Sequence, residues 1–327
     1  MRIVVTGGAG YIGSVVAEVL LADGHQVLVL DNLAKGHRDA VPDGASFSSV
    51  DLLDEHAVAT QLQRYGCEAV IHMAADSLVG ESVADPHKYY RTNVIGGLTL
   101  LAAMRAAAVD RLVFSSTAAV YGDSAVQPID EDVAQRPTNP YGATKLAFEH
   151  ALRWYCQAYK LRATSLRYFN AAGATATRGE RHNPETHLIP LVLETAAGRS
   201  PYVTVFGDDY PTPDGTCIRD YVHVLDLARA HVLALLAEQE PGSSTSYNLG
   251  CGGQGFSVRQ VIAAAEGVTG RPIKIVTVPR RPGDPAVLVA SSDRIARELG
   301  WRPLHATLED IIGSAWAWMQ KAPVESH

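Results

Sequence analysis

Several features that mark particular classes of protein are scarce or missing in this sequence of 327 residues. Cysteine is rare, and its 4 occurrences stand far apart without a Cys-x-x-Cys pair, at Cys67, Cys156, Cys217 and Cys251. This spacing supports neither a disulfide framework nor a cysteine-based metal site, so we expect free thiols in a reducing cytoplasm. No charge-free apolar run is long enough to cross a bilayer. Met1 leads directly into an expected strand, which leaves no room for a signal peptide.

The charge balance disfavours two kinds of binding partner. A formal net charge of −7 disfavours binding to nucleic acid or to an anionic membrane surface. The 12 histidines predict no metal site, because His223 and His231 are far apart in an expected helix, and structural or hydrogen-bonding roles are expected instead. What the sequence does have is a hydrophobic content of 47% and enough length for one large domain or two moderate ones.

The amino-terminal residues have the pattern of a dinucleotide site. Residues 1–6 form a short β-branched apolar run, typical of a buried parallel strand, and a helix is expected to begin at Ser14. Between them, glycines at positions 7, 10 and 13 permit a tight turn and let a pyrophosphate approach the backbone at the positive end of the helix. A second expected strand, residues 26–30, ends at Asp31. This carboxylate can accept both ribose hydroxyls of NAD and would repel the 2′-phosphate of NADP.

Strands and helices alternate until about residue 170. Further strands are expected at 45–50, 69–73, 111–115 and 162–168, with helices at 54–64, 86–108 and 141–159 between them. This alternation predicts an α/β protein with a Rossmann-type, doubly wound parallel sheet. Beyond Asn170, clustered prolines indicate a change of architecture. We expect residues 1–170 to bind NAD, with parts of 215–250 returning to the sheet, and residues 171–327 to form mainly a smaller substrate-binding lobe.

A tyrosine and a lysine carry the candidate chemistry. Tyr141 and Lys145 are four positions apart and project from one face of an expected helix, and the hydroxyl cluster of residues 115–117 precedes them. An ammonium group beside a phenol favours the phenolate, which lets a tyrosine move a proton near neutral pH. An enzyme that oxidises alcohols needs such a group, because the hydroxyl loses its proton as the hydride leaves. Taken alone, the pair also fits an ordinary surface helix.

Longer strings resemble a known family. The glycine turn, the Tyr141/Lys145 pair and residues 167–170 (RYFN) resemble the extended short-chain dehydrogenase/reductase family and, within it, the UDP-glucose 4-epimerase family. The most specific strings are FSSTAAVYG at 114–122, GTCIRDYVH at 215–223 and RRPGDP at 280–285. The resemblance covers nearly the whole chain. It implies an NAD-dependent isomerase of galactose metabolism, which inverts C4 of UDP-hexoses through a transient 4-keto sugar.

The resemblance also implies roles for individual residues. Tyr141 would take the proton of the sugar 4-OH, Thr117 would hold the same oxygen, and Lys145 would bind the cofactor ribose. The positions expected to contact NAD are Gly7, Gly10, Tyr11, Ile12, Gly13, Asp31, Asn32, Asp51, Leu52, Met73, Ala74, Ala75, Thr92, Lys145 and Phe169. The positions expected to contact the UDP-sugar are Thr117, Tyr141, Asn170, His187, Leu188, Arg219, Arg281, Asp284 and Leu288.

Simpler roles stay open for several of these residues. Arg219 and Arg281 can grip a diphosphate with paired N–H donors, but each could instead form an ordinary ion pair, for example with Asp220 or Asp284. Asp51 could contact adenine or cap the helix that follows it.

Other functions on the same fold also stay open. A 4,6-dehydratase or decarboxylase needs a further acid or base just after Thr117, where this sequence has Ala118 and Ala119, whose methyl groups carry no proton. An epimerase of UDP-GlcNAc or UDP-glucuronate is a second alternative. A non-catalytic NAD sensor would not need the tyrosine, the lysine and the hydroxyl, all of which are present.

The resemblance predicts a homodimer and a specificity position. Residues 86–108 and 141–159 have apolar side chains on more than one face, and the family pairs these two helices with their copies in a four-helix bundle. Leu288 stands where the family has a residue near C2 of the sugar. A tyrosine there goes with UDP-glucose and UDP-galactose only, and a smaller residue with N-acetylated sugars as well. We therefore expect detectable but weaker epimerisation of UDP-GlcNAc.

Overall fold

The centre of the protein is a parallel sheet. The computed structural model describes residues 1–281 and 284–321, and within them a seven-stranded sheet has the order β11-β6-β5-β4-β1-β2-β3. Each pairing in this sheet is parallel. Its strands are β1 (Arg2–Thr6), β2 (Gln26–Asp31), β3 (Ser46–Ser49), β4 (Ala69–His72), β5 (Arg111–Thr117), β6 (Arg162–Tyr168) and β11 (Ser244–Leu249).

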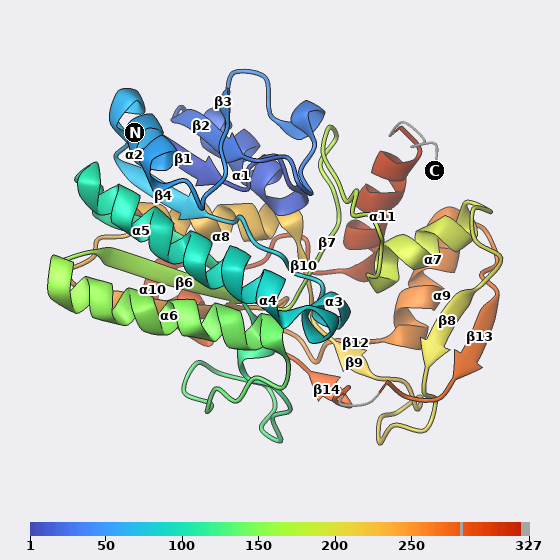
Figure 1. Ribbon diagram of the computed structural model, residues 1–327. Coiled ribbons are helices and arrows are strands. Elements are labelled where there is room, and N and C mark those ends of the chain that lie inside the picture. Colours follow the sequence, from blue (N-terminus) through green and yellow to red (C-terminus); the bar gives the residue numbers. More distant parts are fainter. Residues whose placement is uncertain (282–283, 322–327) are drawn as a thin grey trace.

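Helices cover both faces of this sheet, as Figure 1 shows. Alternate residues of β1 point to opposite faces: Ile3 and Val5 join one hydrophobic core, and Val4 joins the other. The core that contains Ile3 and Val5 packs against α1 (Tyr11–Ala22) and α8 (Val224–Leu236). The core on the opposite face packs against α2 (Glu55–Tyr65), α5 (Gly96–Ala106) and α6 (Pro140–Tyr159). The predicted Rossmann-type doubly wound sheet is confirmed.

Side-chain caps explain where these helices begin. The Asn139 side chain accepts a hydrogen bond from Gly142 N (2.9 Å) and Pro140 opens α6, so the helix starts immediately before Tyr141. The cap of α2 is Asp54, which accepts from Ala57 N (2.9 Å). Asp51 is therefore not the capping residue; its Oδ1 accepts from Leu53 N (2.9 Å), and it lines the cavity described below.

The helix expected over residues 86–108 is present from Pro86 to Ala106, but its middle part is not α-helical. The chain forms α3 (Val79–Ala84), α4 (Pro86–Tyr89), a π-helical turn (Tyr90–Ile95) and then α5. Within the turn, the Asn93 amide donates to Thr144 Oγ1 (3.1 Å) and to the Asp76 carbonyl (3.0 Å). These bonds to α6 and to the segment after β4 hold the wider turn, and an apolar repeat in the sequence cannot reveal them.

Apart from the cores on the two faces of the sheet, a separate core, called the second core below, lies beside the sheet at the right of Figure 1. It includes Val192, Val205, Val261 and Ile311. The remaining elements are α7 (Leu188–Ala196), α9 (Val258–Thr269), α10 (Asp293–Leu299), α11 (Leu308–Met319), β7 (Asn170–Ala172), β8 (Val203–Phe206), β9 (Ile218–Arg219), β10 (Tyr221–His223), β12 (Phe256–Ser257), β13 (Ile275–Val278) and β14 (Val287–Leu288). Pro282 and Gly283 of the quoted RRPGDP string lie outside the described residues.

The sheet order reverses between β1 and β4, which are hydrogen-bonded neighbours. From β1 the chain proceeds to β2 and β3 on one side, and from β4 to β5 and β6 on the other. In doubly wound sheets, ligands bind outside the carboxyl ends of the strands at such a reversal. No helix in the described part of the chain is both long and apolar enough to span a membrane.

Candidate active site

A cavity of about 600 Å³ lies at the carboxyl ends of β1, β2 and β4. The residues predicted to contact NAD that line it are Gly7, Gly10, Tyr11, Asp31, Asn32, Asp51, Leu52, Met73, Ala74, Ala75 and Thr92. Four other predicted positions are not among the described residues that line it: Ile12, Gly13, Lys145 and Phe169.

The glycine turn leaves room for a ligand at the start of α1. Gly7 has a φ of +70°, and a Cβ there would lie 2.5 Å from Ala74 N. A Cβ on Gly13 would lie 2.2 Å from the Gly7 carbonyl oxygen, so the third glycine lets α1 pack against the turn. No side-chain hydrogen bond caps α1 at Gly10, so its first N–H groups face the cavity without a side-chain acceptor. This cradle fits a pyrophosphate.

Asp31 is fixed at the end of β2 by the backbone. Its Oδ2 accepts from Ala9 N (3.0 Å), and its Oδ1 accepts from Leu33 N (2.8 Å). Each carboxylate oxygen keeps a further lone pair for a ribose hydroxyl. The residues of this cavity therefore fit the adenosine half of NAD.

Tyr141 and Thr117 come together as predicted from the sequence. Thr117 ends β5, whose two neighbours in the sheet are β4 and β6. Tyr141 stands in the first turn of α6. Burial raises the pKa of the Tyr141 phenol, and its hydrogen bond with Thr117 partly opposes that rise.

Lys145 lies one turn further along α6 and is 3% exposed. Its Nζ donates to the Ser115 carbonyl (2.8 Å) and lies 4.9 Å from the centre of the Phe114 ring. Burial lowers the pKa of Lys145 to about 7. The expectation that Lys145, together with the positive charge of the cofactor, favours the Tyr141 phenolate stays a prediction. The Lys145 Nζ lies 6.0 Å from the centre of the Tyr141 ring.

A buried ion pair is hydrogen-bonded to the hydroxyl cluster, and it was not predicted from the sequence. Arg167 and Glu149 are each 2% exposed, and Arg167 Nη2 lies 2.6 Å from Glu149 Oε2. The Ser116 hydroxyl donates to Glu149 Oε1 (2.6 Å), and Arg167 Nη1 donates to the Tyr121 hydroxyl (2.8 Å). The pair thus links β5, β6 and α6, the elements that carry Thr117 and Tyr141. A glutamate on the apolar face of an expected helix was the available signal.

A second cavity, of about 570 Å³, lies between the end of β6 and the second core. The predicted substrate positions that line it are Asn170, His187, Leu188, Arg219, Arg281 and Asp284. Arg219 Nη2 lies 2.5 Å from Asp284 Oδ1, and the Arg281 guanidinium lies 3.8 Å from the centre of the Phe206 ring. Two arginines in one cavity suit an anionic ligand such as a diphosphate.

Three predicted substrate positions, Thr117, Tyr141 and Leu288, are not among the described residues that line this cavity. Leu288 lies in β14, which pairs with β9, and its side chain packs with Phe169 against a small core that includes Tyr121 and Ile129. Leu288 is therefore a partly buried strand residue beside this core, and its place near C2 of the sugar stays a prediction.

Residues 177–182 cross from the second core to line the first cavity. Arg178 Nη1 lies 2.6 Å from Glu18 Oε1, and Arg181 Nη1 lies 2.9 Å from Asp39 Oδ1. The next residues turn toward the second cavity, which Glu185 and His187 line. This segment therefore joins the two cavities, and sequence reasoning noticed only His187 in it.

Comparisons with known proteins agree with this geometry. The model of the NAD dependent epimerase/dehydratase family matches residues 3–250. The chain is 53% identical over 327 residues to the UDP-glucose 4-epimerase of Corynebacterium glutamicum, covering 100% of this chain and 98% of the relative.

Solved structures give the same result. A UDP-glucose 4-epimerase from Brucella ovis in complex with NAD is 47% identical, with a TM-score of 0.93 over 96% of this chain and 97% of that one. A UDP-glucose 4-epimerase from Bifidobacterium longum in complex with NAD+ and UDP is 37% identical, with a TM-score of 0.92 over 98% of both chains. The chain belongs to the NAD dependent epimerase/dehydratase family.

Proposed function

We propose that the protein is an NAD-dependent isomerase that inverts C4 of UDP-hexoses and so interconverts UDP-glucose and UDP-galactose. The observation that carries this proposal is the position of Thr117. It ends β5, between β4, whose following residues line the first cavity, and β6, after which Asn170 lines the second. We infer that the Tyr141/Thr117 hydroxyl pair would lie where the dinucleotide and the nucleotide sugar meet. The full-length similarity to UDP-glucose 4-epimerases supports the same reaction.

NAD would lie in the first cavity. The glycine turn and the start of α1 would hold its pyrophosphate, and Asp31 would accept its ribose hydroxyls. Lys145, which lies one helical turn from Tyr141, would bind the second ribose. When bound, NAD supplies the acceptor and the donor of the hydride at C4.

The UDP-sugar would lie in the second cavity. Arg219 and Arg281 would hold the diphosphate with charge-assisted hydrogen bonds, and Asn170, His187 and Leu188 would complete its contacts. Anchoring at the nucleotide lets the sugar ring turn over between the two halves of the reaction.

The proton chemistry belongs to Tyr141 and Thr117. Tyr141 as phenolate would take the proton of the 4-OH, and Thr117 would hydrogen-bond the same oxygen. Because burial raises the pKa of Tyr141 in the cofactor-free protein, the phenolate needs the positive charge that arrives with bound cofactor. Ala118 and Ala119 follow Thr117 and offer no proton for an elimination at C5 and C6.

We also propose the division of labour and the assembly. The amino-terminal 170 residues, with parts of 215–250, would bind NAD, and the remainder would bind mainly the UDP-sugar. The protein would form a homodimer in the cytoplasm. Leu101, Met104 and Leu152 are buried against the sheet, but Ile95 and Trp154 are 52% and 69% exposed on the adjacent helices of Figure 1. These exposed side chains would pack against their copies.

The direct test is to mix the purified protein with UDP-galactose and no added NAD, and to separate the products by chromatography. We expect UDP-glucose to form. In Tyr141→Phe, kcat should fall by roughly 10² to 10⁴ while the fold and bound NAD are retained, which is the usual effect of losing a positioned acid or base. Activity of this variant within a few-fold of the wild type would remove Tyr141 from the mechanism.

A further inference from the structure

The segment between the two cavities repeats a short pattern. Residues 180–187 read Glu-Arg-His-Asn-Pro-Glu-Thr-His, in which a glutamate stands two positions before a histidine twice. Glu180 and His182 line the first cavity, and Glu185 and His187 line the second. The proposed reaction assigns no role to Glu180, His182 or Glu185.

Each half of the repeat folds into the same local structure. Glu180 Oε1 accepts from His182 N (2.9 Å) and lies 2.5 Å from His182 Nδ1. Glu185 Oε1 accepts from His187 N (2.7 Å) and lies 2.7 Å from His187 Nδ1. Each carboxylate therefore fixes the ring of its own histidine.

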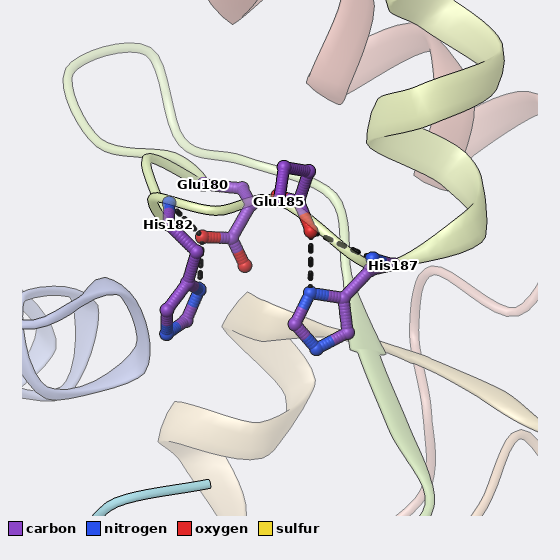
Figure 2. Close-up of side chains that lie close together, drawn as sticks. All are labelled: Glu180, His182, Glu185 and His187. Carbon is purple, nitrogen blue, oxygen red and sulfur yellow. Dashed lines mark hydrogen bonds and ion pairs between the residues drawn. The ribbon is translucent and has the colours of Figure 1, made fainter. Parts of the chain in front are cut away.

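The two halves converge. Figure 2 shows both carboxylates and both imidazole rings gathered on one side of the loop. The ring centres of His182 and His187 are 5.5 Å apart. One ring nitrogen from each histidine and one oxygen from each glutamate all lie within 4.8 Å of one another.

The surroundings of the four groups are partly dry and negative. The exposed fractions of the Glu180 and Glu185 side chains are only 13% and 18%. The pKa of the buried Tyr11 phenol at the start of α1 is raised well above its usual value by burial, and then by the charges of these two glutamates. The two partly buried carboxylates together carry a charge of about −2, which a dication would neutralise.

We propose that Glu180, His182, Glu185 and His187 form a binding site for one divalent first-row transition metal ion, with Zn²⁺ as its ligand. Imidazole nitrogens select zinc and its neighbours over Mg²⁺ and Ca²⁺, which prefer oxygen donors alone. Two nitrogens and two oxygens fill the four positions of a tetrahedral zinc site.

The site closes with small side-chain movements. Tetrahedral zinc with bonds of about 2.0–2.2 Å requires donor atoms about 3.3–3.6 Å apart, so donor pairs that lie up to 4.8 Å apart must approach by at most about 1.2–1.5 Å. Within each Glu–His pair the donors must separate slightly as the metal replaces the shared hydrogen bond. The shared proton then moves to the other ring nitrogen or to solvent. Both adjustments need only rotations of side chains that belong to one loop.

The test is zinc binding to the complete, chelator-treated protein, measured by competition with a fluorescent chelator at neutral pH. We expect one Zn²⁺ per chain with micromolar or tighter affinity, and no displacement by a large excess of Mg²⁺. The double variant His182→Ala/His187→Ala should weaken the binding at least tenfold. A matched control, His56→Ala/His87→Ala, removes two exposed histidines elsewhere and should bind zinc as the wild type does.

Two further measurements keep the result decisive if the histidine variant folds poorly. Glu180→Gln/Glu185→Gln preserves the size of both side chains and should also weaken zinc binding at least tenfold, with a melting temperature that confirms folding. Co²⁺ bound to the wild type should show the strong visible absorption of a four-coordinate site. Absence of saturable zinc binding, equal binding in both cluster variants, or a six-coordinate cobalt spectrum would overturn the proposal.

Discussion

Lys145 combines a basic side chain with almost complete burial, and this makes replacement by methionine informative. Its ammonium is 3% exposed, and burial lowers the pKa from 10.5 to about 7. Folding therefore removes a proton from this amine between pH 7 and 10.5. Because the unfolded chain binds more protons in that window, the wild type gains stability as pH rises through it. Lys145→Met has no such group and gains nothing.

The magnitude follows from the two pKa values. Keeping the amine buried costs about 4 kcal/mol at pH 7 and about 2 kcal/mol at pH 9 relative to the unfolded chain. Methionine fills similar space but loses the hydrogen bond from Nζ to the Ser115 carbonyl, worth about 1 kcal/mol. Cofactor-free Lys145→Met should therefore be more stable than the wild type by about 3 kcal/mol at pH 7 and by about 1 kcal/mol at pH 9.

The assay is urea unfolding of both proteins after removal of bound nucleotide, at pH 7 and pH 9. Lys274→Met, at an exposed position, serves as the control and should change the free energy of unfolding by less than about 0.5 kcal/mol at either pH. The stabilised variant should nevertheless be inactive as an epimerase. A difference between the wild type and Lys145→Met that does not shrink from pH 7 to pH 9 would refute the conclusion that burial holds this amine near neutrality.

Two other changes test the proposed specificity and assembly. Leu288→Tyr should lower kcat/KM for UDP-GlcNAc relative to UDP-glucose, because a larger side chain would narrow the sugar site. An unchanged ratio, or a wild type that ignores UDP-GlcNAc, would remove Leu288 as the determinant. Trp154→Glu should shift the mass measured by light scattering from dimer to monomer. Trp154 is 69% exposed in one chain, and a charged side chain at this position would not pack against its copy in a dimer. A monomeric wild type at micromolar concentration would contradict the proposed assembly.

The cofactor half of the site could be predicted from sequence because its determinants are local. Gly7, Gly10 and Asp31 follow directly from two short strands, and parallel pairing of β1, β2 and β4 brings their carboxyl ends together. Tyr141 was predictable for the same reason, since Asn139 and Pro140 set the start of its helix.

Other features depend on contacts that no local pattern contains. The π-helical turn at Tyr90–Ile95 is held by Asn93, whose partners lie in distant segments. The pKa of Lys145 depends on how deeply the sheet and α6 bury it, and a spacing rule contains no information on that burial. The strands outside the seven-stranded sheet have only two to four residues, too short for a hydrophobic period to be read.

The Glu-x-His repeat shows a different limit of prediction from sequence. It was visible in the sequence, but its meaning depends on the loop that turns both halves toward each other. The two histidines that the sequence analysis considered have structural roles. The His223 side chain caps α8, and the His231 ring is hydrogen-bonded to a backbone carbonyl of the same helix.

The central claim is that a hydride leaves C4 and returns to the same carbon without exchange with water. Its most direct test uses UDP-galactose labelled with deuterium at C4, incubated with the purified protein in ordinary water without added NAD, with the product analysed by NMR and mass spectrometry. The account predicts UDP-glucose that keeps the deuterium at C4. Absence of conversion, or UDP-glucose that has lost the label to solvent, would contradict it.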